Sequence, residues 1–157
     1  GQVVWRKQNV AGPNGTTDVP IRADIEIPDR KFKAALTIRR NNDTSLPASH
    51  TFEMTFQLPP DFAGGGVSNV PGVLMKSNEQ TRGTPLAGLA VKVTDNFFLI
   101  GLSNVDADRS RNLQLLKERS WFDIPLVYTN QRRAIIALEK GPPGERAFAE
   151  AFNVWGQ

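Results

Sequence analysis

The chain has 157 residues, 39% of them hydrophobic and 22% charged, a balance typical of a globular protein with one core and not of a disordered chain. The net charge is only +3, and the basic residues are spread along the chain, which disfavours a nucleic-acid or membrane-surface binder. Cysteine is absent, so disulfides, a thiolate zinc site and a cysteine nucleophile are excluded. The single His50 excludes a multi-histidine metal site, and we expect no cofactor.

The first half of the chain consists of short apolar segments separated by turns. Alternating apolar and polar residues predict strands at 3–5, 21–27, 32–40 and 50–58. A loop rich in Gly, Pro and Asn at 11–18 and turns at 28–30 and 41–45 separate these strands. The alternation is clearest at 50–58, where half-buried antiparallel sheet is indicated by four large residues on one face, Phe52, Met54, Phe56 and Leu58.

The second half adds two helices to further strands. Strands at 89–93 and 97–102 flank Asp95-Asn96, which predicts a hairpin with a tight turn. A helix follows, with Asp106 or Asp108 as the cap of its first turn and basic residues near its end. Strands at 122–128 and 134–138 lead to a terminal helix opened by residues 141–144. Its apolar stripe is predicted to pack on the sheet and consists of Phe148, Ala151, Phe152 and Trp155.

This order predicts a mainly β fold, an antiparallel β-sandwich with one internal helix and one C-terminal helix, in a single domain over residues 1–157. A doubly wound α/β fold is disfavoured because helices do not alternate with the early strands. Apolar runs of roughly 18 residues, the length that spans a membrane, are missing. Because the chain starts at Gly1 without an initiator Met, we expect it to be the soluble part of a longer precursor. Predicted core residues are Leu113, Leu116, Phe122 and Ile124.

Three features that could suggest catalysis or metal binding lack the partners such sites need. His50 has no partner nearby in the sequence, and a surface or strand-end position is the simpler interpretation. The glycines at 64–66 lack the Gly-Lys-Ser/Thr ending of a phosphate loop, so a flexible turn is predicted. Asp106 and Asp108 do not have the ligand spacing of an EF-hand, which favours helix capping.

A carboxylate pair for glycoside chemistry remains open, because its members can be distant in sequence. The candidates alternate with apolar residues, as charges on a solvent face do; they are Asp24, Glu26, Glu53 and Asp123. Such chemistry requires a concave pocket that brings two of them within about 10 Å. Sugar-stacking tryptophans would support it, although core packing is the favoured interpretation of Trp5, Trp121 and Trp155.

The densest basic pairs are Arg39-Arg40 and Arg132-Arg133, and we regard these four residues as candidate ligand-binding residues. If the sheet brings the two pairs together, their guanidinium groups can bind phosphate or an acidic glycan, because the guanidinium fork matches such oxyanions. The simpler interpretation is that they are solvated charges that protect strand edges.

From residue 70 onward the order of features resembles bacterial envelope proteins of the invasion-associated locus B family. The resemblance lies in a Pro71-Gly72-Val73 segment, a hairpin, a short helix with leucines, a strand pair, and a turn into a final helix with Ala147 and Phe148. The chain differs from that family in having no cysteine. The resemblance implies a periplasmic β-sandwich and carries over no catalytic residues. The chain is also similar to uncharacterised bacterial envelope proteins in which such a domain follows an N-terminal anchor.

Together these observations lead to one main hypothesis and two alternatives. The main hypothesis is a non-enzymatic, extracytoplasmic binding or structural domain of the cell envelope, with another envelope protein or a glycan as its partner. The first alternative is a glycan-acting hydrolase or lyase that uses the strand carboxylates. The second is a polyanion-binding module that uses the arginine pairs, although nucleic acid is not the favoured partner.

Overall fold

The computed structural model describes residues 1–12, 15 and 17–157. The described chain is mainly antiparallel sheet with one internal and one C-terminal helix, which confirms the predicted fold class. The predicted loop at 11–18 lies partly outside the described residues, since Pro13, Asn14 and Thr16 belong to it. Among the described residues no helix is long and apolar enough to cross a membrane.

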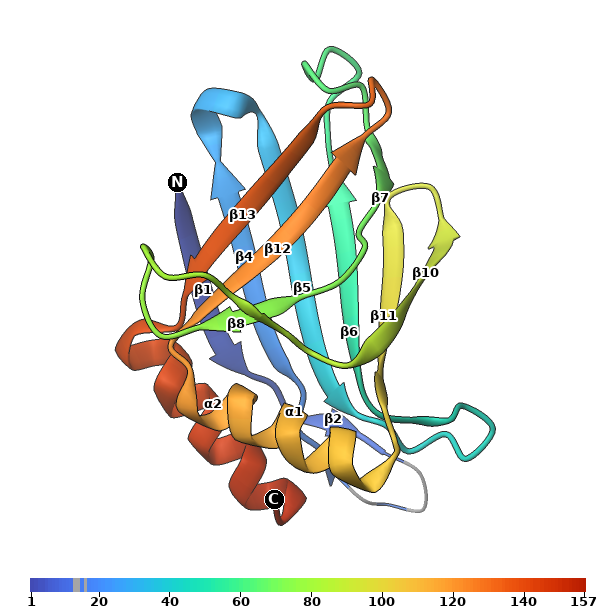
Figure 1. The fold of residues 1–157 in the computed structure, drawn as a ribbon, viewed down its shortest axis with the longest axis vertical. Coiled ribbons are helices and arrows are strands. Elements are labelled where there is room, and N and C mark those ends of the chain that lie inside the picture. The colour runs from blue at the N-terminus through green and yellow to red at the C-terminus, as the bar shows by residue number, and fades with distance from the viewer. Residues whose placement is uncertain (13–14, 16) are drawn as a thin grey trace.

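The larger sheet has six antiparallel strands in the order β1-β4-β5-β6-β11-β10 (Figure 1). Their bounds are β1 Gln2–Lys7, β4 Ile21–Ile27, β5 Phe32–Arg40, β6 Ala48–Gln57, β11 Phe97–Ser103 and β10 Gly88–Thr94. Strands β4, β5 and β6 bury the apolar residues of the predicted alternation, whereas β10 is exposed along most of its length. The Asp95-Asn96 turn joins β10 to β11 as expected, and Asn96 adopts a left-handed backbone with φ of 68°. Strands β1 and β10 are therefore the two edges of this sheet.

The second sheet has five strands built around β12 (Trp121–Tyr128). Its order is β13-β12-β8-β9, and β7 also pairs with β12. The remaining bounds are β13 Arg133–Glu139, β8 Leu74–Lys76, β9 Thr84–Pro85 and β7 Val67–Asn69. A separate two-stranded ribbon consists of β2 Val10–Ala11 and β3 Thr17–Asp18, and the 3-10 turn η2 Pro28–Arg30 lies between β4 and β5.

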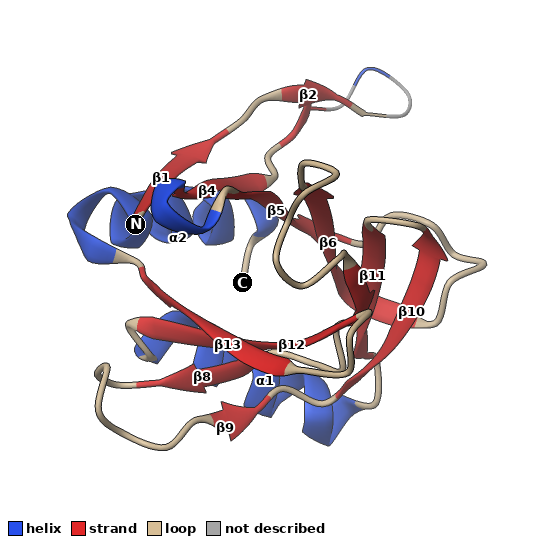
Figure 2. Ribbon diagram, turned by 90° about the horizontal axis from the view of Figure 1, so that it is seen from above, coloured by secondary structure: helices blue, strands red, loops and turns tan. Residues whose placement is uncertain are grey.

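The core lies between the two sheets, which face each other across it (Figure 2). Phe52 of the larger sheet meets Phe122 of the second, with ring centroids 6.2 Å apart, and both side chains are fully buried. Leu116, Phe122 and Ile124 are buried as predicted, while Leu113 is only partly buried and packs against the core.

The C-terminal helix α2 (Gly141–Trp155) packs on β1 beside one sheet edge (Figure 2). Its predicted stripe of Phe148, Ala151, Phe152 and Trp155 is buried. Trp5 of β1 stacks edge-on against Phe148 and donates its indole N–H to the carbonyl oxygen of Glu139 at 2.8 Å. This contact joins the larger sheet to β13 of the second sheet.

Helix α1 (Asp106–Glu118) connects β11 to β12, but its cap differs from the prediction. Its N-cap is Val105, and no side chain caps the first amides. Asp106 and Asp108 lie in the first turn, where negative charge complements the helix dipole. Asp108 instead accepts a hydrogen bond from Ser103 at 2.7 Å, which ties the first turn to the end of β11.

Candidate functional site

Three connections at one end of the molecule surround a depression of about 680 Å³. They are the β4–β5 turn, the loop between β6 and β7, and the β12–β13 turn, at the top of the view in Figure 1. We call this site the turn-end depression. Its lining contains Asp29, Arg30, Lys31, Asp61, Phe62, Ala63, Gly64, Tyr128, Asn130, Arg132, Arg133 and Ala134.

Local backbone geometry fixes the two hairpin turns that carry the basic residues. Pro28 starts the 3-10 turn, and the Lys31 amide donates to its carbonyl at 3.0 Å, which closes the β4–β5 connection. In the β12–β13 turn the Arg132 amide donates to the side chain of Asn130 at 3.0 Å. Gln131 there adopts a left-handed backbone with φ of 75°. Backbone groups and the Asn130 side chain close these turns, so the side chains of Arg30, Arg132 and Arg133 are not needed for closure.

The glycine loop forms the third wall, and it is a turn, as predicted, that packs closely on β12. A Cβ on Gly64 would lie 2.7 Å from the Tyr128 ring, so only glycine allows the loop to approach β12 this closely. Gly65 has φ of +84°, and an added Cβ would lie 2.4 Å from the Thr129 hydroxyl. Thr129 donates that hydroxyl to the carbonyl of Gly64 at 3.0 Å. The glycines therefore permit a packed contact.

The turn-end depression carries an excess of positive charge. Lys31 forms an ion pair with Asp61 at 2.5 Å, and this contact lowers the pKa of the Asp61 carboxyl. Within the described residues no carboxylate lies within ion-pairing distance of Arg30, Arg132 or Arg133. The three guanidinium groups are thus available to an external anion.

An aromatic wall borders these arginines. Phe62 is buried beneath Tyr128, with ring centroids 5.4 Å apart in an edge-to-face arrangement. Tyr128 is half-buried, and burial raises the pKa of its hydroxyl, so the phenol is neutral near pH 7. A neutral phenol ring beside guanidinium groups offers both an apolar face and hydrogen-bond donors.

The two predicted arginine pairs do not come together in the fold. Arg132 and Arg133 lie in the turn-end depression, whereas Arg39 and Arg40 end β5, the strand that begins just after Lys31. Arg39 pairs with Glu53 at 3.0 Å and with Asp18 at 3.7 Å. Arg40 donates to the carbonyl of Trp155 at 3.2 Å, so it holds the end of α2. Arg39 and Arg40 lie at the end of the nine-residue strand β5 that is far from the depression. Arg30 is the third arginine that lines the depression with Arg132 and Arg133.

The sequence did not single out Arg30. It lies in a short turn next to Lys31, and such charged turns are common on protein surfaces. The available signal was that Arg30 and Arg132 both lie at the tips of predicted hairpins. Only the packing of one sheet on the other places those two tips side by side.

Of the four strand carboxylates, Asp24 and Glu26 line a second, smaller depression of about 260 Å³ on the outer face of the larger sheet. As alternate residues of β4 they have Cα atoms roughly 7 Å apart, so the two residues lie near each other in one depression. Asp24, however, already accepts from Arg22 at 3.0 Å and pairs with Arg6 at 3.3 Å. The hydrolase hypothesis stays a prediction.

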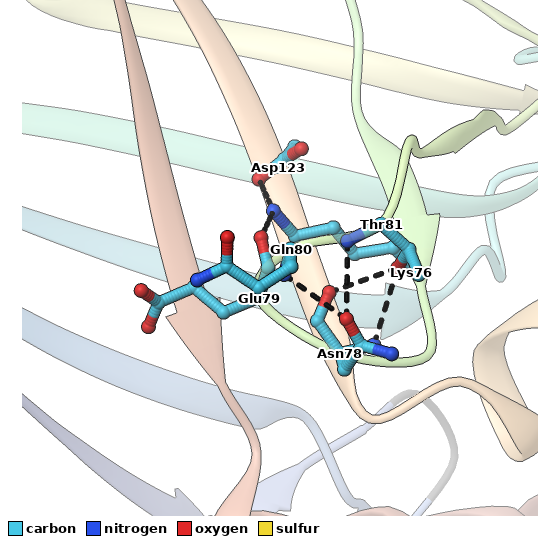
Figure 3. A network of polar contacts seen from close by, with 6 residues as sticks. All are labelled: Lys76, Asn78, Glu79, Gln80, Thr81 and Asp123. Atoms are coloured by element: carbon cyan, nitrogen blue, oxygen red, sulfur yellow. Dashed lines mark hydrogen bonds and ion pairs between the residues drawn. The ribbon is translucent and has the colours of Figure 1, made fainter.

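Asp123 is not on a solvent face, contrary to the prediction. Its carboxylate lies 2.8 Å from the ammonium group of Lys76, and the exposed fractions of the two side chains are 15% and 6% (Figure 3). Lys76 also donates to the carbonyl of Glu79 at 2.9 Å. Asn78 accepts from the amides of Gln80 and Thr81, which closes the loop that covers the ion pair. These contacts assign Lys76 and Asp123 a structural role.

His50 lies near the start of β6, as the strand-end alternative predicted, but it is buried, so the surface alternative is wrong. Its ring lies 2.8 Å from the side-chain oxygen of Gln157 and 3.0 Å from the Ser49 hydroxyl. It also packs against the Trp155 ring, with centroids 5.3 Å apart. Burial lowers the pKa of His50, and this environment explains the residue as an anchor for the C-terminal segment.

Lys140 is a buried lysine like Lys76, and no sequence pattern predicts its burial. It lies between β13 and α2, its ammonium group donates to the carbonyl of Leu116, and it sits 4.1 Å from the centroid of the Phe148 ring. Burial lowers its pKa to about 8. Leu116 is in the last turn of α1, where a cation complements the negative end of the helix dipole.

The tryptophans are divided between core and surface. Trp5 and Trp155 are buried as favoured, while Trp121 is only half-buried beside Lys76.

Across residues 1–12, 15 and 17–157, no group of three or more His, Cys, Asp or Glu side chains is placed to hold a metal ion.

The fold and the turn-end depression define a mainly β protein with two packed antiparallel sheets, segregated helices and a basic, aromatic-lined depression at the hairpin tips. Comparison of the chain with protein-family models, with curated proteins and with solved structures gives no match.

Proposed function

We propose that this chain is a non-catalytic binding domain of the bacterial cell envelope that takes an acidic glycan in the turn-end depression. The observation that carries the proposal is the convergence of Arg30, Arg132 and Arg133, none of which has a carboxylate partner among the described residues. Guanidinium groups bind carboxylate and sulfate oxygens through paired N–H donors. The envelope setting rests on the resemblance of the second half of the chain to known envelope proteins.

The other walls of the depression favour a sugar over a bare anion. Tyr128 supplies an aromatic surface for a pyranose ring, and Asn130 supplies amide groups that suit hydroxyls. A volume of about 680 Å³ is within the range of small-ligand sites and leaves room for more than one ring. A single phosphate would leave most of this surface uncovered.

Binding can be tested by calorimetric titration with a heparin-derived tetrasaccharide, an oligogalacturonate and a neutral oligosaccharide of equal length. We expect the two acidic probes to bind, with an affinity that falls as salt rises, and the neutral probe not to bind. Arg132→Ala and Arg133→Ala should each weaken binding by about tenfold or more, because a hydrogen bond to a charged group contributes roughly 1.5–3 kcal/mol.

Arg146→Ala is the matched control, since Arg146 is exposed on α2 and does not line the depression. It should leave the affinity unchanged. Equal weakening by Arg146→Ala and Arg132→Ala would indicate general charge attraction and contradict the assigned site. Absence of binding by either acidic probe at low salt would contradict the proposed ligand class.

A further inference from the structure

Strand β10 is an unprotected sheet edge with an apolar outer face. It pairs only with β11 among the described strands (Figure 2). Leu89, Val91 and Val93 have exposed fractions of 80%, 55% and 48%. These values are high for branched apolar side chains at consecutive positions of one face, and natural sheet edges usually carry charge or proline there.

The register places Leu89 and Val91 in one row, and Val93 follows at the bulge between Lys92 and Thr94. Ala90 and Lys92 lie opposite Ile100 and Phe98, whose side chains point into the core. Leu89 and Val91 therefore lie on the outer face of the sheet, since side chains alternate along a strand. Val91 pairs there with Leu99, which is half-buried and extends the apolar row onto β11.

The hydrogen-bond pattern identifies the backbone groups that face solvent. The Ser103 amide donates to the Ala87 carbonyl at 2.9 Å, so residue 87 and every second residue after it bond toward β11. The N–H and C=O groups of Gly88, Ala90 and Lys92 consequently point away from β11. Such a row of donors and acceptors can be satisfied by another extended strand.

We propose that a second copy of this chain occupies this edge, with β10 pairing antiparallel to β10 about a two-fold axis at Val91. In that register Val91 faces Val91 of the second copy, and Ala90 faces Lys92 of the second copy. This pairing is self-complementary, which a symmetric dimer requires. Solvent-facing backbone groups of Ala90 and Lys92 meet in bonded pairs, as the observed alternation demands.

Charge also favours a second copy over an acidic or basic partner strand. Lys92 is the only charged residue of β10, and it forms an ion pair with Asp95 at 3.2 Å. In the proposed register Lys92 faces Ala90 of the second copy, so like charges do not oppose each other. A locally neutral strand matches an identical neutral strand.

The strength of the dimer is limited by the length of the ladder. A bulge between Lys92 and Thr94 interrupts regular pairing, so the regular ladder between two copies runs only from Ala90 to Lys92. This contact is smaller than the standard interface of about 1,600 Å². A weak dimer with a micromolar or higher dissociation constant is therefore expected.

The absence of cysteine allows a direct test of the register. Under mild oxidation Val91→Cys should form a disulfide between two copies, because directly opposed residues have Cβ atoms about 4.5–5.5 Å apart. Leu89→Cys alone should not crosslink, because Leu89 does not face Leu89 of the second copy in this register. Val4→Cys and Ile135→Cys are matched controls, since these apolar residues are similarly exposed on β1 and β13.

Sedimentation equilibrium of the unmodified chain should show a mass that rises toward twice the monomer with concentration. Val91→Lys should abolish this rise by placing two ammonium groups face to face, and Ile135→Lys should not. A mass that stays monomeric up to millimolar concentration overturns the proposal. Equal crosslinking of Val4→Cys and Val91→Cys also overturns it, because it would show unspecific collision.

Discussion

His50 shows how far burial changes the chemistry of one side chain in this fold. The sequence offers it as the only group that titrates near neutrality, yet its ring nitrogens are held by Gln157 and Ser49, and Trp155 covers it. Removing an imidazolium from water disfavours the charged form, which is why the pKa falls. The residue thus couples the end of the chain to β6 and does not face a cleft.

This environment predicts acid sensitivity. Unfolded His50 takes up a proton near its ordinary pKa of 6.5, while the folded form resists protonation until lower pH. The unfolded state therefore binds more protons between the two pKa values, and the free energy of unfolding falls as pH drops through that window.

Urea unfolding from pH 7.5 to 4.5 measures this dependence, and His50→Gln should reduce its slope. Because the chain has one histidine, its NMR titration is unambiguous. A folded pKa above 6.5 would contradict the assignment.

At the scale of elements, the buried ion pair links β8 to β12. Lys76 lies directly opposite Trp121 in the register, and its ammonium group reaches across to Asp123 beneath the loop at 77–81. Each of these two buried charges needs the other, because removal of one side chain would leave the opposite charge buried without an ion-pair partner. The pair therefore fixes how the short β8 sits on β12.

Lys76→Met should lower the free energy of unfolding by about 3–5 kcal/mol, because it leaves the Asp123 carboxylate buried and unpaired. The double variant Lys76→Met with Asp123→Leu should recover most of that loss, since apolar residues often replace a buried ion pair without net cost. Chemical denaturation of the three proteins gives the comparison.

Lys92→Met is the control for this prediction. Its ion pair with Asp95 is solvent-exposed, so the change should cost less than about 1 kcal/mol. Similar losses of unfolding free energy for the Lys76 and Lys92 variants would show that the Lys76–Asp123 ion pair contributes no more than an exposed one.

At the scale of the molecule, Phe148 joins α2 to both sheets. Its ring contacts Trp5 of the larger sheet and Phe122 of the second sheet, with centroids 5.6 and 5.7 Å away. The Lys140 ammonium group lies over the same ring. The aromatic stripe of the helix therefore closes the open side of the core.

Phe148→Ala should lower the free energy of unfolding by about 3–5 kcal/mol, the usual cost of removing a fully buried aromatic ring. Val154→Ala, on the exposed face of the same helix, should change it by less than about 0.5 kcal/mol. Thermal unfolding followed by tryptophan fluorescence measures both. A small effect of Phe148→Ala would mean that α2 contributes little to the closed core.

Much of the architecture was predictable because it rests on local periodicity. Alternation over 21–27, 32–40 and 50–58 specified strands, and three- and four-residue spacing specified α2. The helix cap was predicted wrongly because Ser103, an upstream residue, bonds Asp108. Of the four predicted ligand-binding residues, Arg132 and Arg133 line the turn-end depression, whereas Arg39 and Arg40 do not, and ligand binding by any of them stays a prediction.

The sequence by itself determined the strands, the helices and the apolar faces that bury them, because each depends on neighbours a few residues apart. Only the tertiary structure decided which hairpin tips lie together, which charged side chains are buried and which sheet edge is left unpaired. Arg30 meets Arg132 across about a hundred residues of chain because one sheet packs on the other. The exposed row on β10 has the same apolar pattern as a buried strand, and it differs only because no element of the described chain covers it.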